Sequence, residues 1–490
     1  MESVSIAQRR PAPLQSDRMA DGEKPPLTLI GSGLAGALLA AHLGKAGYEL
    51  DLYERRPDPH AGNLVGGRSI NLALSTRGID ALERVGLAEE VLRSAIPMRG
   101  RMIHTLSGET FLQPYDKDPS RCINSIGRGA LNTIALDAAR KHAGVRVHFN
   151  HRCVDVDLDA PRARIVNTET NAEIESTGRI VIGVDGAFSA VRGAMQKLNR
   201  FDYSQSYLRH GYKELTIPPV AGGGFAMEKH ALHIWPRRSF MMIALPNPDG
   251  SFTCTLFWPF EGPSSFAAIR TDDDVRRFFD SQFPDAVPMM PTLLKDFRDN
   301  PTGSMVTVRC APWHHRDKVA LVGDACHAVV PFYGQGMNAA FEDCVALTEC
   351  MERFAPDYGR AFAEYEARRR PNTDALADLA IENFVEMRDK TASRSFHTKK
   401  KVERTLHRLL PGWYTPLYTM ISFTRIPYSK ARRKAQAQDR IVAVGSWFLY
   451  SALVACLLTF APPFLVCMLL ALGLLGLLWF LARNPFDPAE

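Results

Sequence analysis

Apolar runs near the start of the chain predict two buried strands joined by a glycine-rich turn and a helix. Residues 27–30 form a short strand-like run, and the glycine-rich stretch 31–36 separates it from the helical pattern of residues 37–46. Residues 48–53 form a second run, which ends in Glu54, 18 residues beyond the last glycine of the turn. This order and spacing are typical of a β-α-β unit that binds dinucleotides.

A second junction between a strand and a helix lies far along the chain. The apolar run 319–322 leads into Gly323 and Asp324, and a loop rich in proline and glycine then opens a helix at Met337. A carboxylate at the end of a buried strand lies at a sheet edge, and a helix N-terminus favours negative charge. We therefore expect this junction to face a ligand.

The region between these junctions has the alternating pattern of antiparallel strands. Residues 211–217, 232–235, 240–245 and 252–258 are strand-like, and Asn-Pro-Asp-Gly at 247–250 supplies a turn between the last two. A meander placed between pieces of a dinucleotide-binding domain predicts a sheet that forms the roof of a pocket.

Charge is unevenly distributed toward the end of the chain. Residues 388–440 hold 14 Lys/Arg against 3 Asp/Glu, whereas the 41 residues from 441 to 481 contain no charged side chain and no histidine. Crossing a bilayer takes roughly 20 apolar residues, and a pair of prolines divides the apolar stretch into 441–461 and 464–481. Since basic residues flank both ends, we expect a membrane hairpin; a buried pair of core helices is the alternative. The position of the basic segment beside this tail argues against nucleic-acid binding.

The patterns together predict an α/β fold: a Rossmann-like domain with an inserted antiparallel-sheet substrate domain, a helical C-terminal part and a C-terminal transmembrane hairpin. The expected parts are a disordered leader (1–24), the cofactor domain (25–97, 120–200 and 310–350), the substrate domain (98–119 and 201–309), a basic helical region (351–440) and a membrane-anchoring hairpin (441–482).

Composition adds little to this division. The 490 residues are 46% hydrophobic and 23% charged, which is ordinary for a globular protein. The nine cysteines are scattered without a Cys-x-x-Cys pair or a Cys/His cluster, so we expect reduced thiols facing the cytosol, and no disulfide framework or metal site.

Each glycine of the first turn has a physical role. Gly31 permits the tight turn, Gly33 lets the backbone approach a pyrophosphate, and Gly36 lets the helix pack closely on the strand. Glu54 is placed to accept hydrogen bonds from a ribose diol. This unit alone does not distinguish NAD from FAD.

Two further motifs favour FAD. The Asp-Gly pair at 185–186, with Arg192 downstream, and the Gly-Asp pair at 323–324 resemble the paired motifs of single-component FAD hydroxylases. In that family the second aspartate meets the ribityl chain, and the loop after it passes along the isoalloxazine. Residues 334–338 match this loop, because glycines let backbone N–H groups reach the flavin.

The resemblance narrows to the kynurenine 3-monooxygenases, and it extends from about residue 27 to residue 428. The stretch Gly-Arg-Ser-Ile-Asn-Leu-Ala-Leu-Ser-Thr-Arg at 67–77 is similar to a motif of that family. Other flavin hydroxylases share only the glycine-rich, Asp-Gly and Gly-Asp elements. Further matching motifs lie at 98–104, 201–204, 210–215, 232–236, 383–387 and 416–425.

The resemblance implies that L-kynurenine, NADPH and O2 give 3-hydroxykynurenine through a C4a-hydroperoxide of bound FAD. A guanidinium, two phenols and an amide suit the amino-acid end of that substrate. The family's substrate residues fall on Arg101, Tyr115, Asn383 and Tyr418.

The family's cofactor contacts also carry over by position. Cys153 and Ala190 would contact the flavin through backbone atoms, so substituting their side chains would not test these contacts. Tyr333 departs from the Phe or His of relatives, and we expect it to tune the loop without changing the reaction. The remaining contacts carried over, in addition to the glycines, are Ala35, Tyr53, Glu54, Arg55, Arg56, Ala73, Arg128, Asp324, Met337 and Asn338.

The substrate's own amino group activates its ring, so the protein has to supply orientation and exclude water rather than a strong base. No residue is assigned with certainty to catalysis; the flavin-side loop (residues 331–336) contributes Pro331, Phe332 and Tyr333. For the dry wall of the pocket we expect Pro331, Phe332 and the meander strands with Trp235, Phe240 and Met242, although ordinary core packing explains most of these apolar residues equally well. The absence of a second glycine-rich motif predicts that NADPH docks transiently.

Two other functions stay open at this point. One is a related flavin hydroxylase acting on another aromatic or a lipid, and the other is a non-catalytic, membrane-tethered FAD sensor. The oligomeric state is unknown. The expected location is a membrane with the catalytic part in the cytosol: the mitochondrial outer membrane in a eukaryote, or the inner membrane in a bacterium.

Overall fold

The central sheet carries the first glycine-rich turn at its middle strand. The computed structural model describes residues 24–61, 71–116, 118, 120–386, 394–410 and 412–460. Neighbouring strands of this sheet pair in parallel, except for β18 with β19. In spatial order the strands are β18 (His314–His315), β19 (Val319–Leu321), β12 (Ile180–Gly183), β1 (Leu27–Ile30), β2 (Leu50–Tyr53) and β8 (Val145–His148).

Helices cover the central sheet, which explains why its strands are apolar runs rather than alternating patterns. The first helix, α1 (Leu34–Lys45), packs against α4 (Arg128–Arg140) and α9 (Gly336–Phe354). The strands and these helices share one large hydrophobic core. The expected Rossmann-like α/β arrangement is therefore present, and α9 begins one residue before the helix start expected at Met337.

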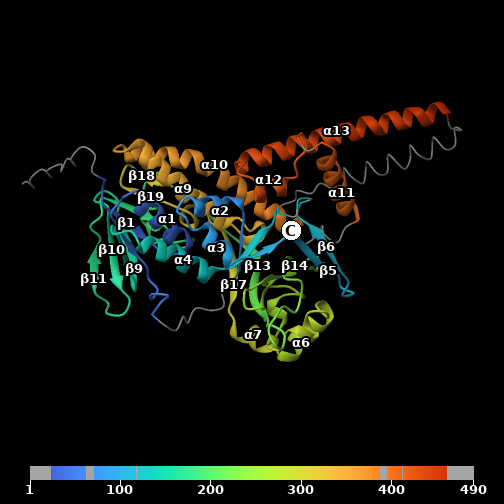
Figure 1. Cartoon of the computed structure of the whole chain (residues 1–490), viewed down its shortest axis with the longest axis horizontal. Helices are drawn as coiled ribbons and strands as arrows, with labels where there is room; N and C mark the ends of the chain where they lie inside the picture. The colour runs from blue at the N-terminus through green and yellow to red at the C-terminus, as the bar shows by residue number, and fades with distance from the viewer. Residues whose placement is uncertain are drawn as a thin grey trace, which may run out of the picture.

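The roof sheet is the second large sheet, and its strands come from two distant parts of the chain (Figure 1). Its pairs are antiparallel except for β14 with β5, which run in parallel because β5 belongs to an earlier hairpin. The order is β17 (Thr302–Ala311), β13 (Asp202–Ile217), β16 (Phe252–Pro259), β15 (Met241–Pro246), β14 (Ala231–Pro236), β5 (Gly100–His104) and β6 (Thr110–Pro114).

The two faces of the roof sheet have different neighbours. On one face, α6 (Asp272–Gln282) and α7 (Leu293–Asp299) lie below the sheet in Figure 1 and share a core with it. On the other face, the sheet packs against α10 (Tyr358–Val385) and the 3-10 turn η3 (Pro331–Tyr333). The second face therefore looks toward the cofactor half of the molecule.

Smaller elements complete the body. A three-stranded sheet in the order β3 (Asn71–Leu74), β7 (Ile123–Gly127) and β4 (Ile96–Met98) connects the two large sheets in sequence, and β11 (Glu173–Glu175), β10 (Arg162–Asn167) and β9 (His151–Asp157) form another at the far end. The remaining short elements are α2 (Thr76–Glu83), α3 (Ala88–Arg93), α5 (Ala190–Met195), α8 (Asp324–His327), η1 (Phe266–Ala268) and η2 (Val287–Met289).

The C-terminal helices lie along one side of the body. They are α11 (Arg394–Leu409), α12 (Leu417–Phe423) and α13 (Tyr428–Phe460), and the first turns of α13 pack against α10 and α12 (Figure 1).

The predicted transmembrane hairpin is wrong. Among the residues that the structure describes, no helix combines the length and the apolar character needed to cross a bilayer. The first predicted segment, 441–461, belongs up to Phe460 to the long helix α13, which begins among the charges around Arg432 and is therefore not a separate apolar helix. The second segment, 464–481, and the leader up to residue 23 lie outside the described residues, as does the start of the 67–77 motif.

Candidate active site

The first turn requires glycine at two positions, because a Cβ there would clash with backbone atoms. Gly31 has φ +102°, and a Cβ there would lie 2.8 Å from both the Cα of Asp185 and the carbonyl oxygen of Val184. A Cβ on Gly36 would lie 1.9 Å from the carbonyl oxygen of Gly31. Gly33 differs, because no described atom lies within 4 Å of where its Cβ would be. Space is thus left beside Gly33 at the N-terminus of α1, where no described side chain caps the helix and an anion would be stabilised.

Glu54 ends β2 beside this turn as a buried carboxylate. It accepts hydrogen bonds from the N–H of Ser32 at 2.8 Å and from Nε of Arg56 at 2.8 Å. Burial alone raises the pKa of Glu54, but the contacts with Arg56 and Ser32 outweigh it and leave the pKa below its ordinary value. Arg55 is exposed. The ring of Tyr53 stacks on His148 with centroids 4.7 Å apart, so its side chain is engaged within the protein.

The late elbow lies directly against the first turn. Gly323 has φ +63°, and a Cβ there would lie 3.6 Å from the Cβ of Ala35. The next residue, Asp324, has an exposed side chain although protein surrounds it closely enough for desolvation to raise its pKa; the charges of His327 and Arg128 act in the opposite direction. The glycine-rich turn and the elbow that bears Asp324, from distant parts of the chain, therefore meet at one edge of the central sheet.

Asp185 and Cys153 lie on the other side of the first turn. Oδ2 of Asp185 accepts a hydrogen bond from the N–H of Ala190 at 2.6 Å, while its Oδ1 has no partner among the described residues. Burial raises the pKa of Asp185. Burial, with the charge of Asp185 as a smaller cause, also raises the pKa of Cys153 to about 12, so this thiol stays protonated.

The side chain of Asn338 holds the flavin-side loop in place through hydrogen bonds to backbone groups. Its Oδ1 accepts a hydrogen bond from the N–H of Ser75 at 2.9 Å, and its Nδ2 donates to the carbonyls of Ala73 and Gly334, each at 2.9 Å. Gly334 has φ +64° at the end of η3. The fully buried Asn338 side chain is thus occupied by the protein, and it determines where the backbone of the loop lies. Met337 is partly exposed at the start of α9.

The predicted substrate residues from β5, the end of β6 and α12 come together. The guanidinium of Arg101 lies 4.8 Å from the ring centroid of Tyr418 and 5.9 Å from that of Tyr115. These two rings stack with centroids 5.1 Å apart. Nε of Arg101 and the hydroxyl of Tyr115 are buried and make no hydrogen bond within the described part of the chain.

Buried polar atoms of this kind normally have a partner, because an unsatisfied donor costs about 1–3 kcal/mol. Burial opposes the charge of Arg101, but the phenols and the carboxylate of Glu386 outweigh it and raise its pKa. The guanidinium is therefore a permanent cation with donor capacity to spare, which suits a carboxylate ligand.

The substrate residues contact the flavin-side loop. Nδ2 of Asn383 donates to the carbonyl of Phe332 at 2.7 Å, and the ring of Tyr333 stacks toward Tyr418 at 5.9 Å. The ring of Phe332 stacks on Phe384 with centroids 4.1 Å apart. Pro331, at the start of the turn, is exposed.

Among the residues expected to form the dry wall, Phe332 packs on the face of the roof sheet that looks toward the cofactor half, whereas Trp235, Phe240 and Met242 lie on the opposite face. These side chains belong to the core shared with α6 and α7, and Nε1 of Trp235 donates to Asp285. The alternate positions on the same strands, Ile234 and Met241, pack against Phe332 instead. A strand shows opposite faces at successive residues, and its sequence does not say which face is toward the site.

Two carboxylates near the site were not predicted. Glu386 lies close enough to Arg101 and Tyr333 to raise the pKa of both, although burial is the larger cause at Tyr333. It follows Asn383 by three residues, a spacing that places both on one helix face. Burial raises the pKa of Glu214, on β13, to about 7, and Arg128 partly offsets this. Alternation along β13 places Glu214 opposite the α7 face, a signal available in the sequence.

Comparison with known proteins agrees with this geometry. A family model described as FAD binding domain matches residues 26–380. The kynurenine 3-monooxygenase of Myxococcus xanthus (strain DK1622) is 48% identical over 425 residues, which cover 87% of this chain and 91% of that protein. The one from Dictyostelium discoideum is 46% identical over 429 residues, covering 85% and 92%.

Solved structures share the fold at lower identity. The p-nitrophenol 4-monooxygenase of Pseudomonas putida DLL-E4 has a TM-score of 0.61 with 19% identity, covering 79% of this chain and 98% of that one. The tetrameric form of 2-methyl-3-hydroxypyridine-5-carboxylic acid oxygenase has a TM-score of 0.60 with 21% identity, covering 73% and 90%. These similarities concern the fold alone. With the family model matching most of the chain and relatives near half identity over nearly their full length, the chain belongs to the FAD-binding kynurenine 3-monooxygenase family.

Proposed function

We propose that the protein binds FAD and hydroxylates L-kynurenine to 3-hydroxy-L-kynurenine, consuming NADPH and O2. The observation that carries this proposal is the cation of Arg101, which lies beside the stacked rings of Tyr115 and Tyr418 and whose buried Nε makes no hydrogen bond within the described part of the chain. Its neighbours are the residues of the flavin-side loop. An amino-acid substrate brings a carboxylate to such a cation, whereas a neutral lipid or a simple phenol does not.

The residues present fit FAD. The space beside Gly33, Oδ1 of Asp185, which has no partner among the described residues, and the exposed carboxylate of Asp324 lie on turns that contact one another. A pyrophosphate and polyol chain need backbone N–H groups and acceptors in such a place. Glu54 is ionised at the far end, as a ribose diol requires. Bound flavin supplies the chemistry of accepting a hydride from NADPH and activating O2.

The chain's own residues bind and orient the substrate. Arg101 holds the carboxylate through its planar fork, and the hydroxyl of Tyr115 is a buried donor beside it. Asn383 fixes the carbonyl of Phe332 and so the distance between the substrate residues and the loop. The aniline nitrogen of kynurenine activates the ring carbon ortho to it, and no strong protein base is needed.

Water is excluded by the face of the roof sheet that packs against η3 and α10. Ile234, Met241, Phe257 and Phe332 form a continuous apolar layer there, and Phe257 lies 4.9 Å from Phe332. A dry layer beside the reacting ring favours oxygen transfer over loss of oxygen as peroxide.

The direct test is to mix purified, yellow protein with NADPH and L-kynurenine in air and to identify the product by mass. We expect a product one oxygen atom heavier than kynurenine and NADPH oxidation that rises with kynurenine. A flavoprotein that oxidises NADPH no faster with kynurenine than with phenol or other aromatic amino acids contradicts the proposal.

A further inference from the structure

We propose that Arg77 is a positioning residue for the substrate half of the site: it holds α12, and with it Tyr418, against the cofactor half. The inference deepens the proposed function and rests on it for the role of Tyr418. Arg77 lies in α2 and is 1% exposed, although it is a charged side chain. Such burial requires partners on several sides, and the structure supplies them.

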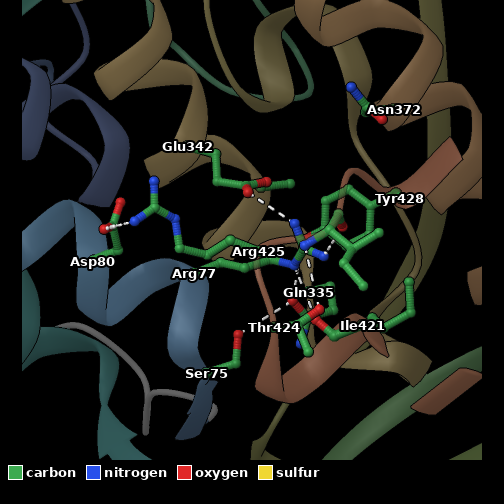
Figure 2. Close-up of polar contacts among 12 residues, drawn as sticks. Ser75, Arg77, Asp80, Gln335, Glu342, Asn372, Ile421, Thr424, Arg425 and Tyr428 are labelled. Atoms are coloured by element: carbon green, nitrogen blue, oxygen red, sulfur yellow. Dashed lines mark hydrogen bonds and ion pairs between the residues drawn. The ribbon is translucent and has the colours of Figure 1, made fainter. Parts of the chain in front are cut away.

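The guanidinium binds the end of α12 through backbone carbonyls. Nε donates to the carbonyl of Ile421 at 2.9 Å (Figure 2). Nη2 donates to the carbonyls of Met420, at 3.4 Å, and of Ile426. The last carbonyls of a helix lack intrahelical hydrogen-bond donors and carry negative partial charge. A buried arginine supplies both the donors and a positive charge.

This contact matters for Tyr418 because α12 is short. Its seven residues run from Leu417 to Phe423, and a helix of this length is unstable without tertiary support. Tyr418 and Ile421 lie three residues apart, on adjacent turns of one face. Fixing the carbonyl of Ile421 therefore fixes the direction in which the Tyr418 ring meets Arg101.

The other side of Arg77 leads back to the cofactor half through a series of ion pairs between buried side chains and the partly buried Glu342. Nη1 of Arg77 pairs with Oε1 of Glu342 at 2.8 Å, and Oε2 of Glu342 pairs with Arg369 at 3.2 Å. Nε of Arg369 pairs with Asp343 at 2.6 Å, and Asp343 contacts His327 in α8. Burial raises the pKa of Asp343, but His327 and Arg369 outweigh it, so the pKa is lowered and the carboxylate stays ionised. This series of ion pairs ends at His327, three residues after Asp324.

A second link joins Arg77 to the flavin-side loop. The guanidinium lies 4.0 Å from the ring centroid of Tyr428, whose hydroxyl donates to Oε1 of Gln335 at 3.1 Å (Figure 2). Ser75, two residues before Arg77, contacts the same oxygen at 3.3 Å. One side chain thus contacts, directly or through one neighbour, both the helix that carries Tyr418 and the loop beside the flavin.

The test compares two arginines at the same junction. Arg77→Lys keeps the positive charge, but the lysine ammonium lacks the planar guanidinium fork with which arginine reaches three carbonyls and Glu342 at once. The matched control is Arg425→Met: Arg425 also connects the C-terminal segment to α2, through Asp80 at 2.5 Å, but its side chain is 57% exposed (Figure 2). Amide hydrogen exchange of residues 414–428 is measured without substrate, and KM for kynurenine, kcat and bound FAD are measured with it.

For Arg77→Lys we expect faster exchange in α12, a KM for kynurenine raised about tenfold and an unchanged ratio of FAD to protein. Arg425→Met leaves all of these values within about twofold. In a Tyr418→Ala background, Arg77→Lys then adds less than about twofold to KM, because both changes act through one contact.

Three results overturn the inference: unchanged exchange in α12, an unchanged KM despite a lower melting temperature, or effects of Arg77→Lys and Tyr418→Ala that multiply. Failure of the proposed function is distinguishable, because the wild-type protein would then not hydroxylate kynurenine. The exchange measurement still decides whether Arg77 holds α12.

Discussion

The cofactor half and the substrate half of the site are built in different ways. In the cofactor half, backbone does most of the work: Gly31 and Gly36 leave no room for a Cβ, and Gly33 leaves space at a helix end. In the substrate half, Tyr115 after β6, Tyr418 in α12 and Glu386 after α10 converge on one cation, Arg101 of β5. A site made of backbone depends on a short stretch of sequence, whereas a site made of converging side chains depends on the whole fold.

The largest expected effect separates two glycines of the first turn that lie three residues apart in the sequence but have different surroundings. Gly36→Ala places a Cβ 1.9 Å from the Gly31 carbonyl, so we expect a loss of at least about 3 kcal/mol of stability and no bound FAD. Gly33→Ala meets no described atom within 4 Å, so its apo protein melts like wild type while the FAD dissociation constant rises about 10- to 100-fold. Thermal melts of apo protein and FAD titrations check both. A destabilised Gly33→Ala apo protein would contradict the contrast.

The second prediction removes the cation of the substrate half. Arg101→Ala leaves the cofactor half untouched, so FAD stays bound while KM for kynurenine rises about 100-fold or more. Steady-state kinetics and the flavin content of the purified variant are the measurements. Arg93→Ala is the control: its side chain is 66% exposed and pairs with Glu89, which is 88% exposed, and such a pair is worth only about 0–1 kcal/mol. Unchanged kynurenine affinity in Arg101→Ala would refute its assignment.

The third prediction tests which face of the roof sheet is the dry wall. Phe332→Ala removes the stack on Phe384 and should cost about 3 kcal/mol of stability, with more NADPH oxidised for each product formed. Phe240→Ala removes an equally buried ring on the opposite face. It should cost similar stability but leave the ratio of product to NADPH unchanged. The yields of product and peroxide per NADPH are the measurements. If both variants waste the same share of NADPH as peroxide, the two faces do not differ in excluding water.

The smallest effect concerns pH. The pKa of Glu214 is raised to about 7 in the folded protein, chiefly by burial, so ionising it costs stability as pH rises from about 4.5 through 7. Glu214→Gln should therefore match wild type near pH 4 and exceed its stability near pH 8 by about 1 kcal/mol, after allowance for partial exposure. Denaturant melts at both pH values measure this. A variant that is less stable at pH 8 would mean that the Glu214 carboxylate has a compensating partner.

The comparison also explains what the sequence predicted. The β-α-β unit, the Gly-Asp elbow and the strands of the roof sheet are local patterns, and each was found close to its expected position. Which face of the sheet looks toward the site is not local information, so the alternation of residues does not place Trp235 on the correct side. The prediction of a membrane hairpin is wrong because an apolar run does not show where its helix begins: α13 begins among charged residues and continues into the run. The contacts of Arg77 with Met420, Ile421 and Ile426 join segments that no spacing rule connects.

The parallel pairing of β5 with β14 has a consequence for biosynthesis. The hairpin of β5 and β6 leaves the ribosome well before residues 231–236, which complete its inner edge. During that interval β5 presents unpaired N–H and C=O groups, while Phe111 and Leu112 on β6 are exposed even in the finished protein. Edges of this kind recruit other strands. Slow translation between these segments should therefore lower the soluble yield, and chaperones that cover nascent strands should restore it.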